Sequence, residues 1–131
     1  MVKFGYTILY VQDVTKAITF YEEAFGFTRK FITPENDYGE LATGDTTISF
    51  ASQTLANSNL KEGFIASDLN NKPFATELGF VTEDVASVLE LALRNGAKEV
   101  TAPQQKPWGQ TVAYLRDIDG FLIEICTPMR P

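Results

Sequence analysis

Residues 77–96 read ELGFVTEDVASVLELALRNG, and this stretch decides the fold. It begins with a short strand-like run, and after Asp84 its apolar residues recur at helical spacing. Asp84 suits the N-cap of a helix, because a short carboxylate accepts hydrogen bonds from the free amides of the first turn. Gly96 suits the left-handed residue that ends a helix. The stretch therefore predicts a strand followed by a helix.

The same pattern occurs about 70 residues earlier, where residues 6–26 read YTILYVQDVTKAITFYEEAFG. Here Asp13 takes the place of the N-cap and Gly26 takes the place of the terminating glycine. Three further strand-like runs follow each predicted helix. They lie at residues 27–33, 37–43 and 46–52 in the first half, and at 98–102, 110–116 and 120–127 in the second. Each half therefore reads βαβββ, which indicates a duplication.

The repeat predicts a single α+β domain, residues 1–131, made of two tandem βαβββ modules. The predicted boundaries are 1–53 for the first module, 54–73 for a linker and 74–131 for the second module. The linker segment is rich in Asn, Ser and Lys and contains Gly63 and Pro73, as is typical of connecting segments. A chain of 131 residues, 44% of them hydrophobic, is long enough for one compact domain with a substantial core.

Charge and hydropathy exclude several classes of partner. The 11 basic and 17 acidic residues give a net charge of −6, which repels nucleic-acid phosphates and anionic lipid surfaces. No apolar run is long enough to span a bilayer, and the N-terminal residues begin a strand pattern where a signal peptide needs a longer apolar segment. We therefore expect a cytoplasmic protein that binds neither nucleic acid nor membrane. The single cysteine, Cys126, excludes an intrachain disulfide and is expected to be a small buried residue.

Two carboxylates interrupt otherwise apolar strands: Glu77, and Glu124 in the last run, GFLIEIC at 120–126. Strand alternation predicts that both lie on the sheet face away from the helices, together with Tyr6 and Ser49. A buried acid needs a partner or a purpose, because removing it from water is costly. The chain has no histidine, so these carboxylates indicate a metal held by oxygen ligands, proton transfer or capture of a polar ligand.

Several short motifs accompany the doubled pattern. They are YVQDV at 10–14, FY at 20–21, FGF at 25–27, FVTEDV at 80–85, GA at 96–97, KPWGQT at 106–111 and DIDGFLIE at 117–124. In these motifs the chain resembles the vicinal oxygen chelate superfamily, which includes glyoxalase I, bleomycin and fosfomycin resistance proteins and extradiol dioxygenases. The resemblance implies that each module rolls into a cup-shaped, mostly antiparallel half-barrel. It also implies a homodimer in which modules from two chains complete each cup.

The resemblance also implies positions for a metal site. Metal-dependent members ligate a divalent ion near the start of the first strand and on the last strand of each module, which here correspond to Tyr6, Ser49, Glu77 and Glu124. A phenol and a hydroxyl are weak ligands at neutral pH, so only Glu77 and Glu124 remain as strong ones. This implies either no metal or a hard ion such as Mg²⁺ or Mn²⁺ completed by waters and substrate. The missing histidines argue against a standard glyoxalase I or extradiol dioxygenase.

Three functions remain open. The first is a protein that binds a small cationic or aromatic molecule, with Tyr38 and Tyr114 among the aromatic residues that suit such a ligand. Its predicted ligand-binding residues are Tyr6, Ser49, Glu77, Trp108 and Glu124. The second is a divalent-metal-dependent lyase or isomerase of the glyoxalase type, in which Glu124 is a metal ligand or general base and Tyr6 is a proton donor. In the third, the two carboxylates are structural and bond to Tyr6, Ser49 or Arg116.

The Trp108 ring has two possible positions in the folded protein. It is the only tryptophan, and it lies in the predicted loop 104–110 beside Gly109. The ring either overhangs the mouth of the cleft or packs as an ordinary aromatic residue at an edge.

Overall fold

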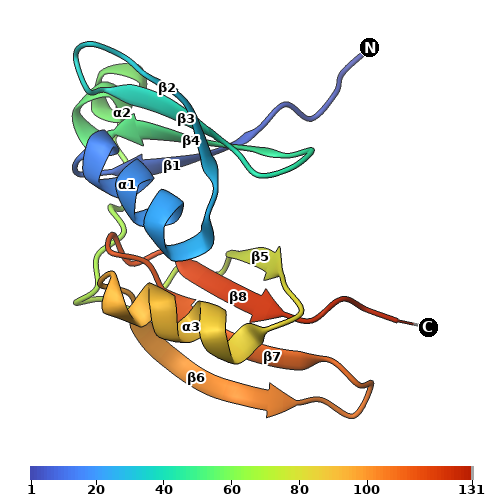
Figure 1. Cartoon of the computed structure of the whole chain (residues 1–131). Coiled ribbons are helices and arrows are strands. Elements are labelled where there is room, and N and C mark those ends of the chain that lie inside the picture. Colours follow the sequence, from blue (N-terminus) through green and yellow to red (C-terminus); the bar gives the residue numbers. More distant parts are fainter. Residues whose placement is uncertain (131) are drawn as a thin grey trace. The chain divides into compact units, whose positions relative to one another are not determined.

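The computed structural model describes residues 1–130, in which three helices accompany two four-stranded sheets (Figure 1). Contacts between Cα atoms divide the chain into two compact units. Unit 1 contains residues 1–22 and 26–66, and unit 2 contains residues 23–25 and 67–131.

Unit 1 holds the first sheet. Its elements are β1 (Thr7–Val11), α1 (Val14–Phe25), β2 (Thr28–Ile32), β3 (Tyr38–Ala42), β4 (Thr47–Ser52) and α2 (Gln53–Asn59). The last three residues of α1 are grouped with unit 2. The strand order is β1-β4-β3-β2, in which β1 runs parallel to β4 and the other neighbours are antiparallel.

Unit 2 repeats this topology. Its elements are β5 (Glu77–Val81), α3 (Val85–Arg94), β6 (Lys98–Gln105), β7 (Thr111–Arg116) and β8 (Leu122–Cys126). The strand order is β5-β8-β7-β6, again with one parallel pair, β5 and β8, and two antiparallel pairs. The predicted α+β class with two βαβββ modules is therefore confirmed.

The helix caps follow the sequence closely. Asp13 Oδ1 accepts a hydrogen bond from the Lys16 amide at 3.2 Å, and Asp84 Oδ1 accepts one from the Ser87 amide at 3.1 Å. Gly26 ends α1 with a left-handed φ of 74°. In α3 the C-cap is Asn95, one residue before the predicted Gly96, which follows it with a φ of 108°. Both N-cap predictions are confirmed.

The segment predicted to be a linker begins with a helix. Ser52 Oγ accepts a hydrogen bond from the Leu55 amide at 3.0 Å and so caps the seven-residue helix α2. Ala56 of this helix is buried, and farther along the segment the Phe64 ring packs edge-on against Tyr10 with ring centroids 4.9 Å apart. Three of the Asn and Ser residues that indicate a linker, Asn57, Ser58 and Asn59, are exposed residues of this short helix. Residues up to 66 therefore belong to unit 1.

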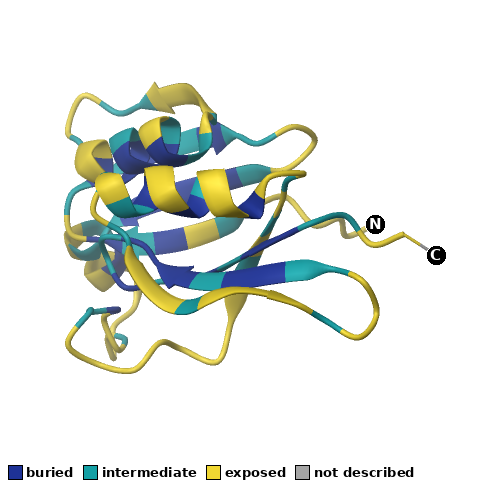
Figure 2. Ribbon diagram, turned by 60° about the horizontal axis from the view of Figure 1, so that its bottom comes forward, coloured by how far each residue is buried: buried dark blue, intermediate teal, exposed yellow. Residues whose placement is uncertain are grey.

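The core of each unit lies between its helix and the inner strands. In unit 1, Leu9 and Val11 of β1 and Ile48 and Phe50 of β4 are buried, and each pair is two residues apart, as strand alternation requires of residues on one face. Figure 2 shows buried residues along inner strands, whereas the residues of β2 and β6 at the sheet edges are mostly exposed. Within residues 1–130, no helix is long and apolar enough to cross a membrane.

Gly39 of β3 shows how closely α1 packs on its sheet. A Cβ at this buried position would lie 2.6 Å from Ile18 Cδ1 and 3.0 Å from the Phe31 carbonyl oxygen. We predict that Gly39→Ala lowers the free energy of unfolding by about 1–3 kcal/mol, the usual cost of overpacking a core. Urea denaturation followed by circular dichroism measures this loss.

The Ile18→Val substitution provides the matched test, because it removes the Cδ1 atom that the new methyl group would meet. Alone it should cost about 0.5–1.5 kcal/mol. Combined with Gly39→Ala, it should cost less than the sum of the two single losses. Strictly additive losses would show that the helix contact is not the cause.

Candidate functional site

The candidate site lies on the face of the second sheet that points away from its buried apolar layer. Leu115, Ile123 and Ile125 fill the buried face. On the other face, the strand register puts Glu124 of β8 between Gly79 of β5 and Tyr114 of β7. Because neighbouring strands are about 4.8 Å apart, these two residues are the direct neighbours of Glu124 across the sheet. Glu124 therefore has a phenol on one side and a glycine on the other.

Four side chains form what we call the Glu124 cluster: Glu77, Tyr114, Glu124 and Cys126. The Tyr114 hydroxyl donates a hydrogen bond to Glu124 Oε1 at 2.9 Å. Glu77 and Glu124 also interact with each other. Partial desolvation, hydrogen bonding with Glu124 and the charge of Glu124 raise the pKa of Glu77. Glu77 therefore retains a proton more readily than an isolated glutamate would.

The other two members of the cluster are neutral at physiological pH. The hydrogen bond to Glu124, burial and nearby negative charge raise the pKa of Tyr114 to about 12. Burial, with the hydrogen bond and charge of Glu124, raises the pKa of Cys126 to about 11. Tyr114 therefore acts as a hydrogen-bond donor. Cys126 is a free, buried thiol, as expected for a small residue of the strand, and the raised pKa disfavours a reactive thiolate.

The expectation that both acids are buried is wrong for Glu77. Glu124 is half-buried, whereas Glu77 is exposed. Glu77 begins β5, an edge strand that pairs only with β8, and Val81 on the same face is 65% exposed. An edge strand offers a side chain less cover than an inner strand, which explains the difference.

Unit 1 contains a second carboxylate that accepts a hydrogen bond from a tyrosine hydroxyl. The Tyr38 hydroxyl donates to Glu40 Oε2 at 2.8 Å, and the Ser49 hydroxyl donates to the same oxygen at 3.4 Å. Burial raises the pKa of Tyr38; the hydrogen bond with Ser49 lowers it, and Glu40 and Tyr6 raise it further. Lys30 Nζ lies 3.9 Å from Glu40 Oε1, so this carboxylate has a cation nearby. Among residues 1–130, no lysine or arginine forms an ion pair with Glu77 or Glu124.

The structure distributes the predicted site residues between the two units. It brings Glu77 to Glu124 in unit 2 and buries Ser49 beside Glu40 in unit 1. Tyr6 precedes β1 and is 48% exposed. Trp108, in the loop between β6 and β7, is 60% exposed, and its Nε1 donates to Gln110 Oε1 at 2.7 Å. This exposure does not fit ordinary edge packing, and the role of Trp108 at a cleft stays a prediction.

Arg116 is not a partner of either carboxylate, so this part of the structural hypothesis is wrong. Its buried guanidinium donates to three backbone carbonyls: Gly120 at 2.8 Å, Asn71 at 2.6 Å and Asp68 at 3.0 Å. These bonds attach the segment before β5 to the turn between β7 and β8. Arg116 is therefore structural, and it leaves the Glu124 cluster without a cation.

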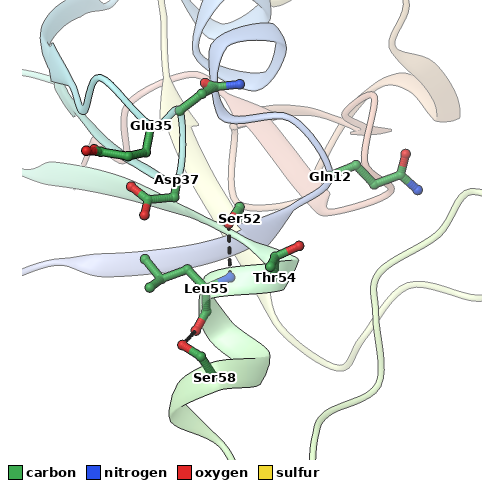
Figure 3. Close-up of a pocket in the computed structure, with 8 residues that line it drawn as sticks. Gln12, Glu35, Asp37, Ser52, Thr54, Leu55 and Ser58 are labelled. Atoms are coloured by element: carbon green, nitrogen blue, oxygen red, sulfur yellow. Dashed lines mark hydrogen bonds between the residues drawn. The ribbon is translucent and has the colours of Figure 1, made fainter.

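Unit 1 also has an open hollow of about 500 Å³ (Figure 3). Polar residues from the loop before β3 and from the start of α2 line it, among them Glu35, Asp37 and Ser52. Figure 3 shows that Ser52 and Ser58 use their hydroxyls to bond Leu55 of α2. The hollow contains none of the predicted site residues.

The donor set of the Glu124 cluster does not fit a resident divalent metal. Within the described part of the chain, no three His, Cys, Asp or Glu side chains gather where they could hold one ion. Glu77 has a raised pKa beside Glu124, and the neighbouring phenol and thiol have raised pKa values that disfavour their ligating forms. Such a cluster binds protons and hydrogen-bond donors more readily than a hard cation.

Comparisons with known proteins find a matching family model, similar relatives and a solved structure with a similar fold. A family model described as a glyoxalase-like domain matches residues 4–130. The chain is 30% identical over 119 residues to the uncharacterized protein YraH of Bacillus subtilis, and the alignment covers 89% of this chain and 91% of that protein. It is 27% identical over 128 residues to a putative lactoylglutathione lyase of Brassica oleracea, covering 94% of this chain and 43% of that protein. A glyoxalase-related enzyme from Fulvimarina pelagi has a similar fold, with a TM-score of 0.81 at 18% identity, covering 98% and 89% of the two chains.

The raised pKa of Glu77 predicts how the free energy of unfolding depends on pH. Below the ordinary glutamate pKa its protonated form is compatible with the fold, and stability is lost as pH rises through the raised folded-state pKa. Glu77→Gln removes this loss and keeps a hydrogen-bond donor for Glu124. We expect a gain of up to about 0.5 kcal/mol at pH 8, small because solvent screens an exposed residue, and no gain at pH 4.

Urea denaturation at the two pH values measures this effect. The matched control is Glu62→Gln, which removes a negative charge from an exposed glutamate outside the cluster. An equal gain in both variants would show that the effect comes from the net charge of the protein. A loss of stability in Glu77→Gln at pH 8 would contradict repulsion between the two carboxyl groups.

Proposed function

The chain belongs to the glyoxalase-like domain family, and from this premise we propose that it binds a small organic cation at the Glu124 cluster without a metal ion. One observation carries the proposal. Glu124 accepts a hydrogen bond from Tyr114 and raises the pKa of the neighbouring Glu77, while no lysine or arginine of residues 1–130 pairs with either acid. The cluster therefore has negative charge that its own chain does not neutralise.

A ligand cation supplies what this cluster lacks. Two adjacent carboxyl groups repel when both are ionised, so one retains a proton unless a positive charge replaces it. An ammonium or amidinium group replaces that proton and donates hydrogen bonds to both acids. Tyr114 holds one oxygen of Glu124 in place, which orients the carboxylate before the ligand arrives. The net charge of −6 also favours the approach of cations.

This mode of binding is linked to pH. The cation binds the form in which both Glu77 and Glu124 are ionised, so binding releases the proton that Glu77 retains. Because the pKa of Glu77 is raised, this release occurs at a pH where an isolated glutamate is already ionised. The affinity for the cation should therefore increase as pH rises through the raised pKa of Glu77.

The proposal also includes further binding residues, a homodimer and a cytoplasmic location. Trp108 offers an exposed aromatic face for stacking, and Tyr6 and Ser49 stay predicted ligand-binding residues. The resemblance implies a homodimer, and the composition implies a cytoplasmic location. One relative is named as a putative lactoylglutathione lyase. It supports a second candidate function, a metal-dependent lyase or isomerase in which Glu124 is the metal ligand or general base and Tyr6 is the proton donor. The donor chemistry of the cluster favours the metal-free proposal.

Calorimetric titration with benzamidine and benzylamine tests the proposal. We expect stoichiometric binding to the wild-type protein, and binding weaker by roughly tenfold or more for the uncharged analogues benzamide and benzyl alcohol. Glu124→Gln should abolish binding of both cations. Titrations from pH 5 to pH 8, in buffers with different ionisation heats, should show binding that tightens as pH rises, with proton release that is largest below the raised pKa of Glu77 and disappears above it.

Two further variants locate the site. Glu62→Gln is the charge control and should bind benzamidine like the wild type. Binding that survives Glu124→Gln but is lost in Glu40→Gln would move the site to the phenol and carboxylate of unit 1 and overturn the proposal.

A metal titration separates the two functions. Metal-stripped protein titrated with Mg²⁺, Mn²⁺, Ni²⁺ and Zn²⁺ should show no stoichiometric binding. Stoichiometric binding that Glu124→Gln abolishes would contradict a metal-free site and favour the lyase or isomerase.

A further inference from the structure

Gly79 is a glycine that the fold does not require. It lies in the interior of β5, directly opposite Glu124 in the parallel pairing with β8. Its backbone has no positive φ, and a Cβ at this position would meet no heavy atom of residues 1–130 within 4 Å. By contrast, a Cβ at Gly39 would lie 2.6 Å from Ile18. Neither a turn nor close packing within the described chain therefore explains Gly79.

A glycine at such a position has a cost. Glycine in a strand interior is less stable than alanine by roughly 0.5–1 kcal/mol, because it loses more backbone freedom on folding. Strand glycines without a bulge or turn often mark places where a ligand or another backbone approaches closely. The equivalent position of the other module is Ile8, which pairs with Ser49 as Gly79 pairs with Glu124. The missing side chain is therefore particular to the strand beside Glu124.

We propose that Gly79 determines ligand specificity: its bare backbone is the surface on which the flat part of a planar aromatic cation lies beside Glu124. This inference rests on the proposed function and names its ligand class. On one side of Glu124, the Tyr114 hydroxyl already occupies a carboxylate oxygen. On the other side, the space above Gly79 is open. A ligand therefore reaches Glu124 over Gly79.

The positions of the two acids favour a planar ligand with its charge at one end. Glu77 lies two residues from Gly79 on β5 and points to the same face, about 6.6–6.8 Å along the strand. Glu124 lies on the adjacent strand, about 4.8 Å away. A cationic group at this corner contacts both carboxylates, while an attached ring extends over the peptide units at Gly79. A side chain at position 79 would occupy the volume of that ring.

The test measures benzamidine affinity in a graded series at position 79. Gly79→Ala should weaken binding moderately, and Gly79→Val should weaken it by roughly tenfold or more, because the branched side chain fills the open space. Both variants should be at least as stable as the wild type, since a side chain there meets no described atom and valine favours strands. Gly5→Val is the matched control, because a Cβ at Gly5 also meets nothing within 4 Å and Gly5 precedes β1 in unit 1.

The outcomes distinguish this inference from the proposed function. If Gly79→Val binds benzamidine as tightly as the wild type, or loses stability by more than Gly5→Val does, the inference is overturned and the cation site stands. If the wild type binds acyclic butylamine through Glu124 but not benzamidine, the planar ligand class is wrong and the function stands. If the wild type binds neither cation, both fail.

Discussion

Two carboxyl groups brought together by the pairing of β5 with β8 are the constraint on which this site depends. The backbone pairing of the two parallel strands puts Glu77 and Glu124 on one face of the sheet, where the charge of Glu124 raises the pKa of Glu77. Retention of a proton by Glu77 relieves the repulsion in the free protein. A ligand cation relieves it better, because it replaces the proton and leaves both acids ionised. Ligand recognition and proton affinity are then two consequences of the same arrangement.

The two modules use one framework for different chemistry. In unit 1, Glu40 accepts hydrogen bonds from a tyrosine and a serine and has Lys30 3.9 Å away, so its charge is largely satisfied within the chain. In unit 2, Glu124 has a tyrosine and a second acid as neighbours. Ile8 fills the position beside Ser49, and Gly79 leaves it open beside Glu124. The two modules therefore share the strand order and register and differ in the side chains at these positions.

Local signals in the sequence predicted most of the fold. The caps at Asp13 and Asp84 depend on three or four neighbouring residues, and strand alternation depends on a period of two, so both can be read without the tertiary structure. Helix α2 was harder to predict because it has only seven residues and a composition typical of loops. These local signals do not specify the strand order, whereas membership of the glyoxalase-like family does.

The site was less predictable because its contacts depend on strand order and register. The exposure of Glu77 follows from β5 being an edge strand, which the sequence of β5 alone does not specify. The bond between Tyr114 and Glu124 requires the register of β7 against β8. The charge of Arg116 indicates an acidic partner, whereas its partners include backbone carbonyls 45 and 48 residues away in sequence. Long-range contacts of this kind leave no local pattern.

The most direct test is an NMR titration of the side-chain carboxyl carbons of Glu77 and Glu124, in the wild type and in Glu124→Gln. The account predicts that Glu77 titrates above the ordinary glutamate value of about 4.3 in the wild type. In Glu124→Gln its pKa should move back toward that value, because the neighbouring negative charge is gone. A Glu77 that titrates at the ordinary value in both proteins would show that the two carboxyl groups do not interact, and would contradict the account.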